Sequence, residues 1–101
     1  MGLEIILQDE RGHVLESLED PKNVLHRVLQ PYQGRDSVLA EIDWYGDTVF
    51  NRIQIPRFLT AWHEMAKTSA NPEEAKLIDQ ISALAERCED GVHLYLKFIG
   101  D

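Results

Sequence analysis

Cysteine is almost absent from this sequence, with Cys88 the single example among 101 residues. One thiol forms neither an internal disulfide nor a multi-cysteine metal site. Cys88 falls on the apolar stripe of a predicted helix, so we expect it to be buried and unreactive rather than a nucleophile.

Long apolar runs and targeting signals are also missing. No stretch approaches the roughly 20 apolar residues that span a bilayer. The opening sequence MGLEIILQDE lacks the basic segment and cleavage site of a signal peptide, and Ile6 stands where N-myristoylation requires serine or threonine. These absences predict a cytoplasmic protein that does not bind membranes.

Basic residues are scarce, with ten Lys and Arg against 18 Asp and Glu and a net charge of −8. The negative electrostatic potential of such a chain opposes binding to nucleic acid and to anionic membranes, and it attracts a basic partner. Solubility alone is the commoner reason for an acidic surface, so the charge favours a basic protein partner without requiring one.

Motifs with a catalytic or metal-binding spacing are missing as well. The chain has no phosphate-binding glycine loop and no nucleophile elbow. His63-Glu64 begins like a zinc motif, but Lys67 occupies the position of the required second histidine. We therefore expect no bound metal or cofactor, and these patterns favour a binding protein over an enzyme.

What remains is the composition of an ordinary globular domain, with 44% hydrophobic and 28% charged residues, and it predicts one domain over residues 1–101. The predicted elements follow the order β-β-α-β-β-α-α-β. This order implies an α+β fold with a largely antiparallel sheet of about five strands and helices packed on one face. Ile6, Tyr95 and Ile99 then lie on the other face, which is either solvated or the interface of a homodimer.

The first half of the chain contains two predicted hairpins. Alternation of apolar and polar residues predicts strands over residues 3–8 and 13–18, and Asp20-Pro21 predicts the start of a helix. The same alternation predicts a third strand over residues 38–45. A turn at Gly46-Asp47 then leads to a short return strand.

The second half is predicted to be helical until its last strand. Residues 56–68 and 72–90 carry apolar stripes at helical spacing, and Asn71 is a strong cap for the second helix. The short connection through Ser69-Ala70 predicts that the two helices pack antiparallel. Residues 92–99 alternate and form the final strand.

The junction between the predicted central hairpin and the following helix concentrates polar and aromatic side chains. Trp and Tyr anchor protein interfaces, and neighbouring acids pair with basic partners. The alternative is structural: the polar residues satisfy backbone groups, the tryptophan is core and the tyrosine covers the sheet edge. The candidate partner-binding residues are Asp43, Trp44, Tyr45, Asp47, Asn51, Arg52 and Gln54.

Four segments of the second half resemble a group of small uncharacterised bacterial proteins. They are YGDTVFN at 45–51, RIQIP at 52–56, ALAERC at 83–88 and HLYLKFIGD at 93–101. The resemblance implies a bacterial cytosolic protein of similar length. The resemblance identifies no catalytic residue.

Three functional hypotheses follow. The first is a small acidic protein-binding module, most concretely an immunity-type protein that neutralises a basic toxin. The second is a homo-oligomeric structural or regulatory protein that uses the free sheet face. The third is a small enzyme with a site at residues 47–56, in which Asp47, Asn51 and Arg52 join His63 or His93 in one pocket.

Overall fold

The structure, a computed structural model, describes residues 2–68 and 71–100. Four antiparallel strands form one sheet in the order β2-β1-β4-β3. The strands are β1 (Glu4–Asp9), β2 (Val14–Glu19), β3 (Asp47–Phe50) and β4 (Leu94–Ile99). The helices are α1 (Val24–Leu29), α2 (Ile55–Ala66) and α3 (Pro72–Asp90), with 3₁₀ turns η1 (Gln30–Tyr32) and η2 (Val38–Glu41).

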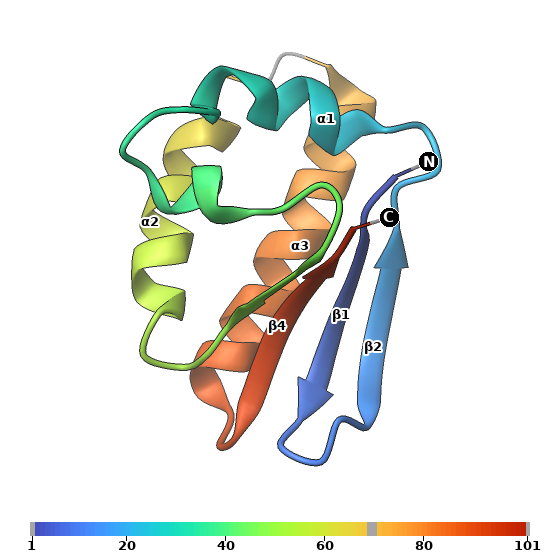
Figure 1. Cartoon of the computed structure of the whole chain (residues 1–101), viewed down its shortest axis with the longest axis vertical. Coiled ribbons are helices and arrows are strands. Elements are labelled where there is room, and N and C mark those ends of the chain that lie inside the picture. The colour runs from blue at the N-terminus through green and yellow to red at the C-terminus, as the bar shows by residue number, and fades with distance from the viewer. Residues whose placement is uncertain (1, 69–70, 101) are drawn as a thin grey trace.

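The predicted α+β class is confirmed, and the helices pack against one face of the sheet. Figure 1 shows α3 behind β4 and β1, with α2 beside α3 and running in the opposite direction, as predicted. Inward-facing residues of the strands, such as Ile5, Leu96 and Phe98, are fully buried under these helices. The predicted connection at Ser69-Ala70 lies outside the described residues.

Most predicted strands and the long helix are found close to their predicted limits. The opening hairpin forms, and Gly12 has a φ of +83° in its turn. Asn71 caps α3, because its side-chain oxygen accepts a hydrogen bond from the Glu73 N–H at 2.8 Å. The last strand begins at Leu94 rather than at residue 92, since His93 adopts a left-handed φ of +58°.

The predicted strand over residues 38–45 is wrong, and the sheet therefore has four strands rather than five. Val38, Leu39 and Ile42 are all buried, with at most 6% of each residue exposed. A strand turns successive side chains to opposite faces, whereas one helical turn places this set on one side. Ser37 starts η2 by accepting the Leu39 N–H, and β3 pairs with β4 instead of with the preceding segment.

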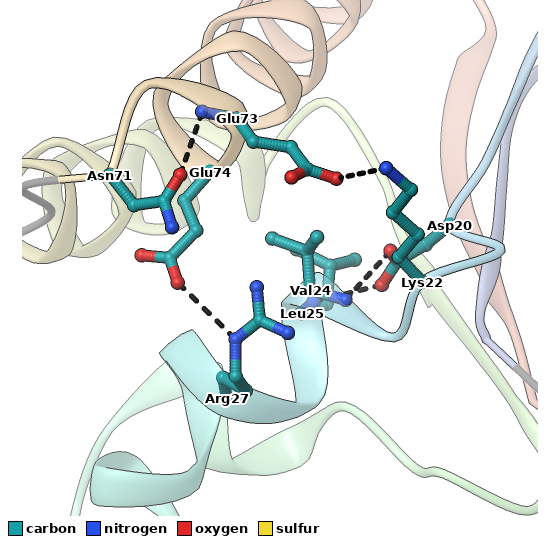
Figure 2. A network of polar contacts seen from close by, with 8 residues as sticks. All are labelled: Asp20, Lys22, Val24, Leu25, Arg27, Asn71, Glu73 and Glu74. Carbon is teal, nitrogen blue, oxygen red and sulfur yellow. Dashed lines mark hydrogen bonds and ion pairs between the residues drawn. The ribbon is translucent and has the colours of Figure 1, made fainter.

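The predicted start of the first helix at Asp20-Pro21 is also wrong, although Asp20 does cap it. The helix begins at Val24, after Asn23 in a left-handed conformation. Figure 2 shows the Asp20 carboxylate reaching forward to the N–H groups of Val24 and Leu25, both at 2.8 Å. Burial to 3% exposure makes Asp20 a structural anchor between β2 and α1.

The lone thiol is buried, as predicted. Cys88 has no exposed surface, and its Sγ donates to the Leu94 carbonyl at 3.4 Å. Burial raises the pKa of the Cys88 thiol to about 11. The thiolate is the reactive form, so this cysteine is inert at neutral pH.

Candidate protein-binding face

The sheet face opposite the helices carries two adjoining rows of side chains, and we call it the open face. Residues that pair across antiparallel strands point to the same side of the sheet. The first row runs across all four strands and consists of Glu19, Glu4, Ile99 and Asp47. The next row on this face consists of Ser17, Ile6, Lys97 and Val49.

Carboxylates occupy three of the four positions of the first row, and we call Glu19, Glu4 and Asp47 the acidic row. Lys97 pairs with Asp47, its Nζ 3.4 Å from Oδ2. Within residues 2–68 and 71–100, Glu4 and Glu19 make no ion pair. The row therefore has an excess of negative charge at its β1–β2 end.

Glu4 and Glu19 form the closer of the two kinds of antiparallel pair. The Asp20 N–H donates to the Leu3 carbonyl at 3.2 Å, which makes the adjacent Leu3–Asp20 pair a hydrogen-bonded one. The two kinds alternate, so Glu4 and Glu19 form a non-hydrogen-bonded pair, with Cα atoms about 4.5 Å apart and side chains in proximity. Like charges directly opposite each other destabilise a sheet.

The ion pairs of the basic side chains lie mainly on the helical side and at the sheet edges. Lys22, in the turn before α1, pairs with Glu73 of α3 at 3.1 Å, and Arg27 of α1 pairs with Glu74 of α3 at 3.4 Å (Figure 2). Arg87 of α3 pairs with Glu16 of β2. These contacts leave Glu4 and Glu19 without a cation among the described residues.

Four of the predicted partner-binding residues lie in or beside the acidic row. Asp43 accepts the Tyr45 N–H at 2.9 Å and so shapes the turn into β3, while Tyr45 is 84% exposed. Trp44 is half-buried against the core and lies 5.2 Å from the His26 ring. Asp47 belongs to the row itself. This end of the sheet thus combines acids with one exposed aromatic ring.

The other three predicted residues lie at the far end of β3, about 13 Å away by the rise of a strand. Asn51 accepts the N–H groups of Ile53 and Gln54, both at 3.0 Å, and the Gln54 side chain accepts the Asn51 N–H at 2.8 Å. These contacts build the turn into α2. The structural alternative therefore describes Asn51 and Gln54, while Arg52 is exposed.

The proposed enzyme site is not assembled by the fold. A shallow cavity of about 320 Å³ does bring Asn51, Arg52 and His93 together. Asp47 lies at the opposite end of β3, bound to Lys97, and His63 is an exposed residue of α2 outside this cavity. The Asn51 side-chain oxygen is already occupied by two backbone donors.

Asp9, which pairs with the cavity-lining residue Leu94, has a shifted pKa. The pKa of Asp9 is lowered, chiefly because its carboxylate accepts a backbone hydrogen bond from His13, with a further one from Arg11. The His13 ring lies 3.3 Å from the same carboxylate. Asp9 thus stabilises the β1–β2 turn, and the contact is structural.

Glu4 and Glu19 were missed by the sequence reasoning. Each is an ordinary polar residue within an alternating strand, so neither stands out alone. The signal lies in their pairing, because a β1–β2 hairpin around residues 9–13 sets them opposite each other. The turn alone does not give the pair, because the register shifts between Gln8, which pairs with Val14, and Leu7, which pairs with Glu16.

Comparison of the chain with models of protein families, with curated proteins and with solved structures gives no match. Among the described residues, no helix has the length and apolar character needed to cross a membrane. The same residues contain no group of three or more His, Cys, Asp and Glu side chains arranged to hold a metal ion.

Replacing Glu19 by glutamine is expected to raise the free energy of unfolding by about 0.2–1 kcal/mol, because it removes a like-charge pair from adjacent strands. Urea denaturation followed by circular dichroism measures the change. Asp36→Asn is the matched control, since Asp36 is exposed and belongs to none of the ion pairs among the described residues. An equal gain in both variants would assign the effect to net charge rather than to the pair.

Proposed function

We propose that this protein is a protein-binding module that docks a basic partner on the open face of its sheet. The acidic row carries the proposal: Glu4 and Glu19 lie opposite each other, at a cost to the sheet, with no cation from the described chain. A partner lysine or arginine placed over this pair relieves the repulsion and gains a charge contact. The bound basic residue then neutralises charge that no cation of the described residues offsets.

Apolar surface on the same face supports the proposal. Val49 is 44% exposed beside the row, and Val14 is 56% exposed further along β2. Tyr45 adds an exposed ring next to Asp47. Apolar contact area with an aromatic anchor and a charged rim is the usual composition of a protein interface.

The most concrete form of this function is an immunity-type protein that neutralises a basic toxin. Opposite charges speed the association of such pairs and favour the correct partner. The same open face also suits a second copy of the chain, through Val14 and Val49. Each copy, however, carries a net charge of −8 and the same acidic row, which opposes self-association.

The test is a comparison of three tagged proteins in host lysate: wild type, E4Q/E19Q, and the control D36N/D79N. The control removes the same charge from exposed positions in the loop after η1 and on α3. We expect one basic protein to co-purify with wild type and control, and to be lost at high salt. The row variant should bind it about tenfold more weakly, as expected for two charge contacts.

Equal retention by the row variant and the control would contradict docking at the acidic row. The immunity form makes a further claim, that the purified partner is toxic and that this protein abolishes its activity. A non-toxic partner with the expected dependence on Glu4 and Glu19 would reject the immunity form alone.

A further inference from the structure

We propose that β2 is a docking edge, and that the partner adds an extended segment with Lys or Arg at alternate positions as a fifth strand. This inference rests on the proposed function, because it specifies how the basic partner reaches the acidic row. It commits to one occupant, an extended basic segment of another protein.

The first observation is that β2 is an edge strand with no strand on its outer side among the described residues. It lies at the end of the sheet order and pairs with β1 alone. Five of its six residues are exposed, Leu18 being the exception. Edge strands are commonly protected by charged side chains, proline, a β-bulge or a covering segment. The sequence VLESLE contains no lysine or proline; its charges are the carboxylates of Glu16 and Glu19, which repel an acidic strand but not a basic one, and the register shift lies near its start, opposite Gln8. Figure 1 shows β2 at the outer side of the sheet, with β1 on its inner side.

The second observation concerns the backbone groups of β2. Ile5 pairs with Leu18 and Leu7 with Glu16, and both pairs belong to the hydrogen-bonded kind that includes Leu3–Asp20. The N–H and C=O groups of Ser17 and Glu19 consequently point away from β1. Two residues with outward-facing donors and acceptors are the template that an added strand uses.

The third observation is the match between this edge and the acidic row. A residue opposite Glu19 in an added strand lies on the open face, one strand from Glu19 and two from Glu4. A basic residue there meets both carboxylates. The next residue faces Leu18 on the helical side, where an apolar side chain extends the core contact of this partly buried leucine. Alternating basic and apolar residues therefore fit β2.

The same charges argue against a second copy as the occupant. Pairing two β2 strands brings Glu19 of each copy to one seam, and β2 has no basic residue to offset it, while the Arg87 side chain is already paired with Glu16. Like charges on paired strands are unfavourable. A basic segment of another protein has no such conflict.

The probe is the capped peptide KVKVKVKV, titrated into the isotope-labelled full chain and followed by NMR. We expect shifts centred on residues 14–19 and slower hydrogen exchange at the amides of Ser17 and Glu19. The peptide EVEVEVEV should not bind. Concentration-dependent sedimentation of the protein alone, with β2 shifts and no peptide, would instead assign the edge to a second copy and overturn the inference.

Two changes test backbone pairing without altering charge. Ser17→Pro removes an outward N–H at an edge position where proline is tolerated, and Ser17→Ala is its control. The second is the same peptide with every backbone nitrogen methylated, which leaves the protein untouched and so does not depend on the proline variant folding. We expect each to weaken binding at least about tenfold, since paired backbone hydrogen bonds are lost.

The outcomes separate this inference from the proposed function. Binding of KVKVKVKV that is weakened by E4Q/E19Q but unchanged by backbone methylation overturns strand addition and leaves docking at the acidic row intact. Binding of the peptide that E4Q/E19Q leaves unchanged contradicts both strand addition and docking at the acidic row. Loss of binding with E4Q/E19Q, with Ser17→Pro and with backbone methylation supports both claims.

Discussion

Replacing Trp62 by alanine is expected to lower the free energy of unfolding by about 3–5 kcal/mol, the range for deleting a large aromatic side chain from a core. Trp62 has no exposed surface, and its ring stacks on Phe58 with centroids 5.1 Å apart. Phe98 of β4 lies 6.3 Å away. The loss is a large share of the about 5–15 kcal/mol that stabilises a typical domain.

The indole N–H gives the effect a second component. Trp62 Nε1 donates to the Ile78 carbonyl at 3.1 Å and so joins α2 to α3. Trp62→Phe retains an aromatic ring over Phe58 but removes this donor and part of the volume. We expect it to cost less than alanine, about 1–2 kcal/mol, because one buried hydrogen bond contributes about 1 kcal/mol.

Urea denaturation followed by far-ultraviolet circular dichroism measures these losses, since the chain has only two tryptophans and fluorescence would change with either. Trp44→Ala is the matched control. Trp44 is half-buried beside the exposed His26, so its loss leaves no closed cavity and should cost less than Trp62→Ala. Equal costs at the two positions would show that the aromatic contacts of Trp62 with Phe58 and Phe98 do not dominate stability.

The elements that the sequence predicts well are those with a local signal. Asn71 and Pro72 mark the start of α3, and the alternation of Leu94, Leu96 and Phe98 identifies β4. In each case a short stretch of residues has only one arrangement that buries its apolar side chains. The long helix and the last strand were therefore predictable from the sequence alone.

The segment 38–45 has two arrangements that local pattern does not separate. Val38, Ala40 and Ile42 alternate as in a strand, while Val38, Leu39 and Ile42 lie on one side of a helical turn. Packing against the core decides, because the helical turn buries Leu39 and the strand exposes it. The candidate partner-binding residues are divided into two groups for a related reason. Asp43–Asp47 and Asn51–Gln54 are neighbours in sequence, but β3 holds them at opposite ends.

The acidic row needs information that no single segment contains. Glu19, Glu4 and Asp47 come together only through the registers of β2 with β1, β1 with β4 and β4 with β3. A one-residue slip in any register turns one of these carboxylates to the other face. Non-local pairing therefore creates the surface that we propose for binding, and strand patterns alone do not reveal it.

Asp20→Ala is expected to cost about 2–4 kcal/mol, more than the loss of any exposed ion pair in its neighbourhood. Its two carboxylate oxygens accept the N–H groups of Val24 and Leu25, and both donors are buried. Alanine leaves those two N–H donors without an acceptor, because water does not reach them to replace the carboxylate. Hydrogen bonds to a charged group contribute about 1.5–3 kcal/mol each before the structure relaxes. Asp20→Asn retains one acceptor and should cost less than alanine.

Lys22→Ala is the control from the same segment. Lys22 pairs with Glu73 at 3.1 Å, but its side chain is 73% exposed, and such pairs contribute about 0–1 kcal/mol. Hydrogen exchange gives a local measurement beside urea denaturation: Asp20→Ala should speed exchange at Val24 and Leu25, and Lys22→Ala should not. A cost for Asp20→Ala no larger than that for Lys22→Ala would mean that α1 is held by its buried side chains Val24, Leu25 and Leu29 rather than by its cap. We expect the cap to dominate, because a six-residue helix has few backbone hydrogen bonds of its own and both capped donors lie in the core.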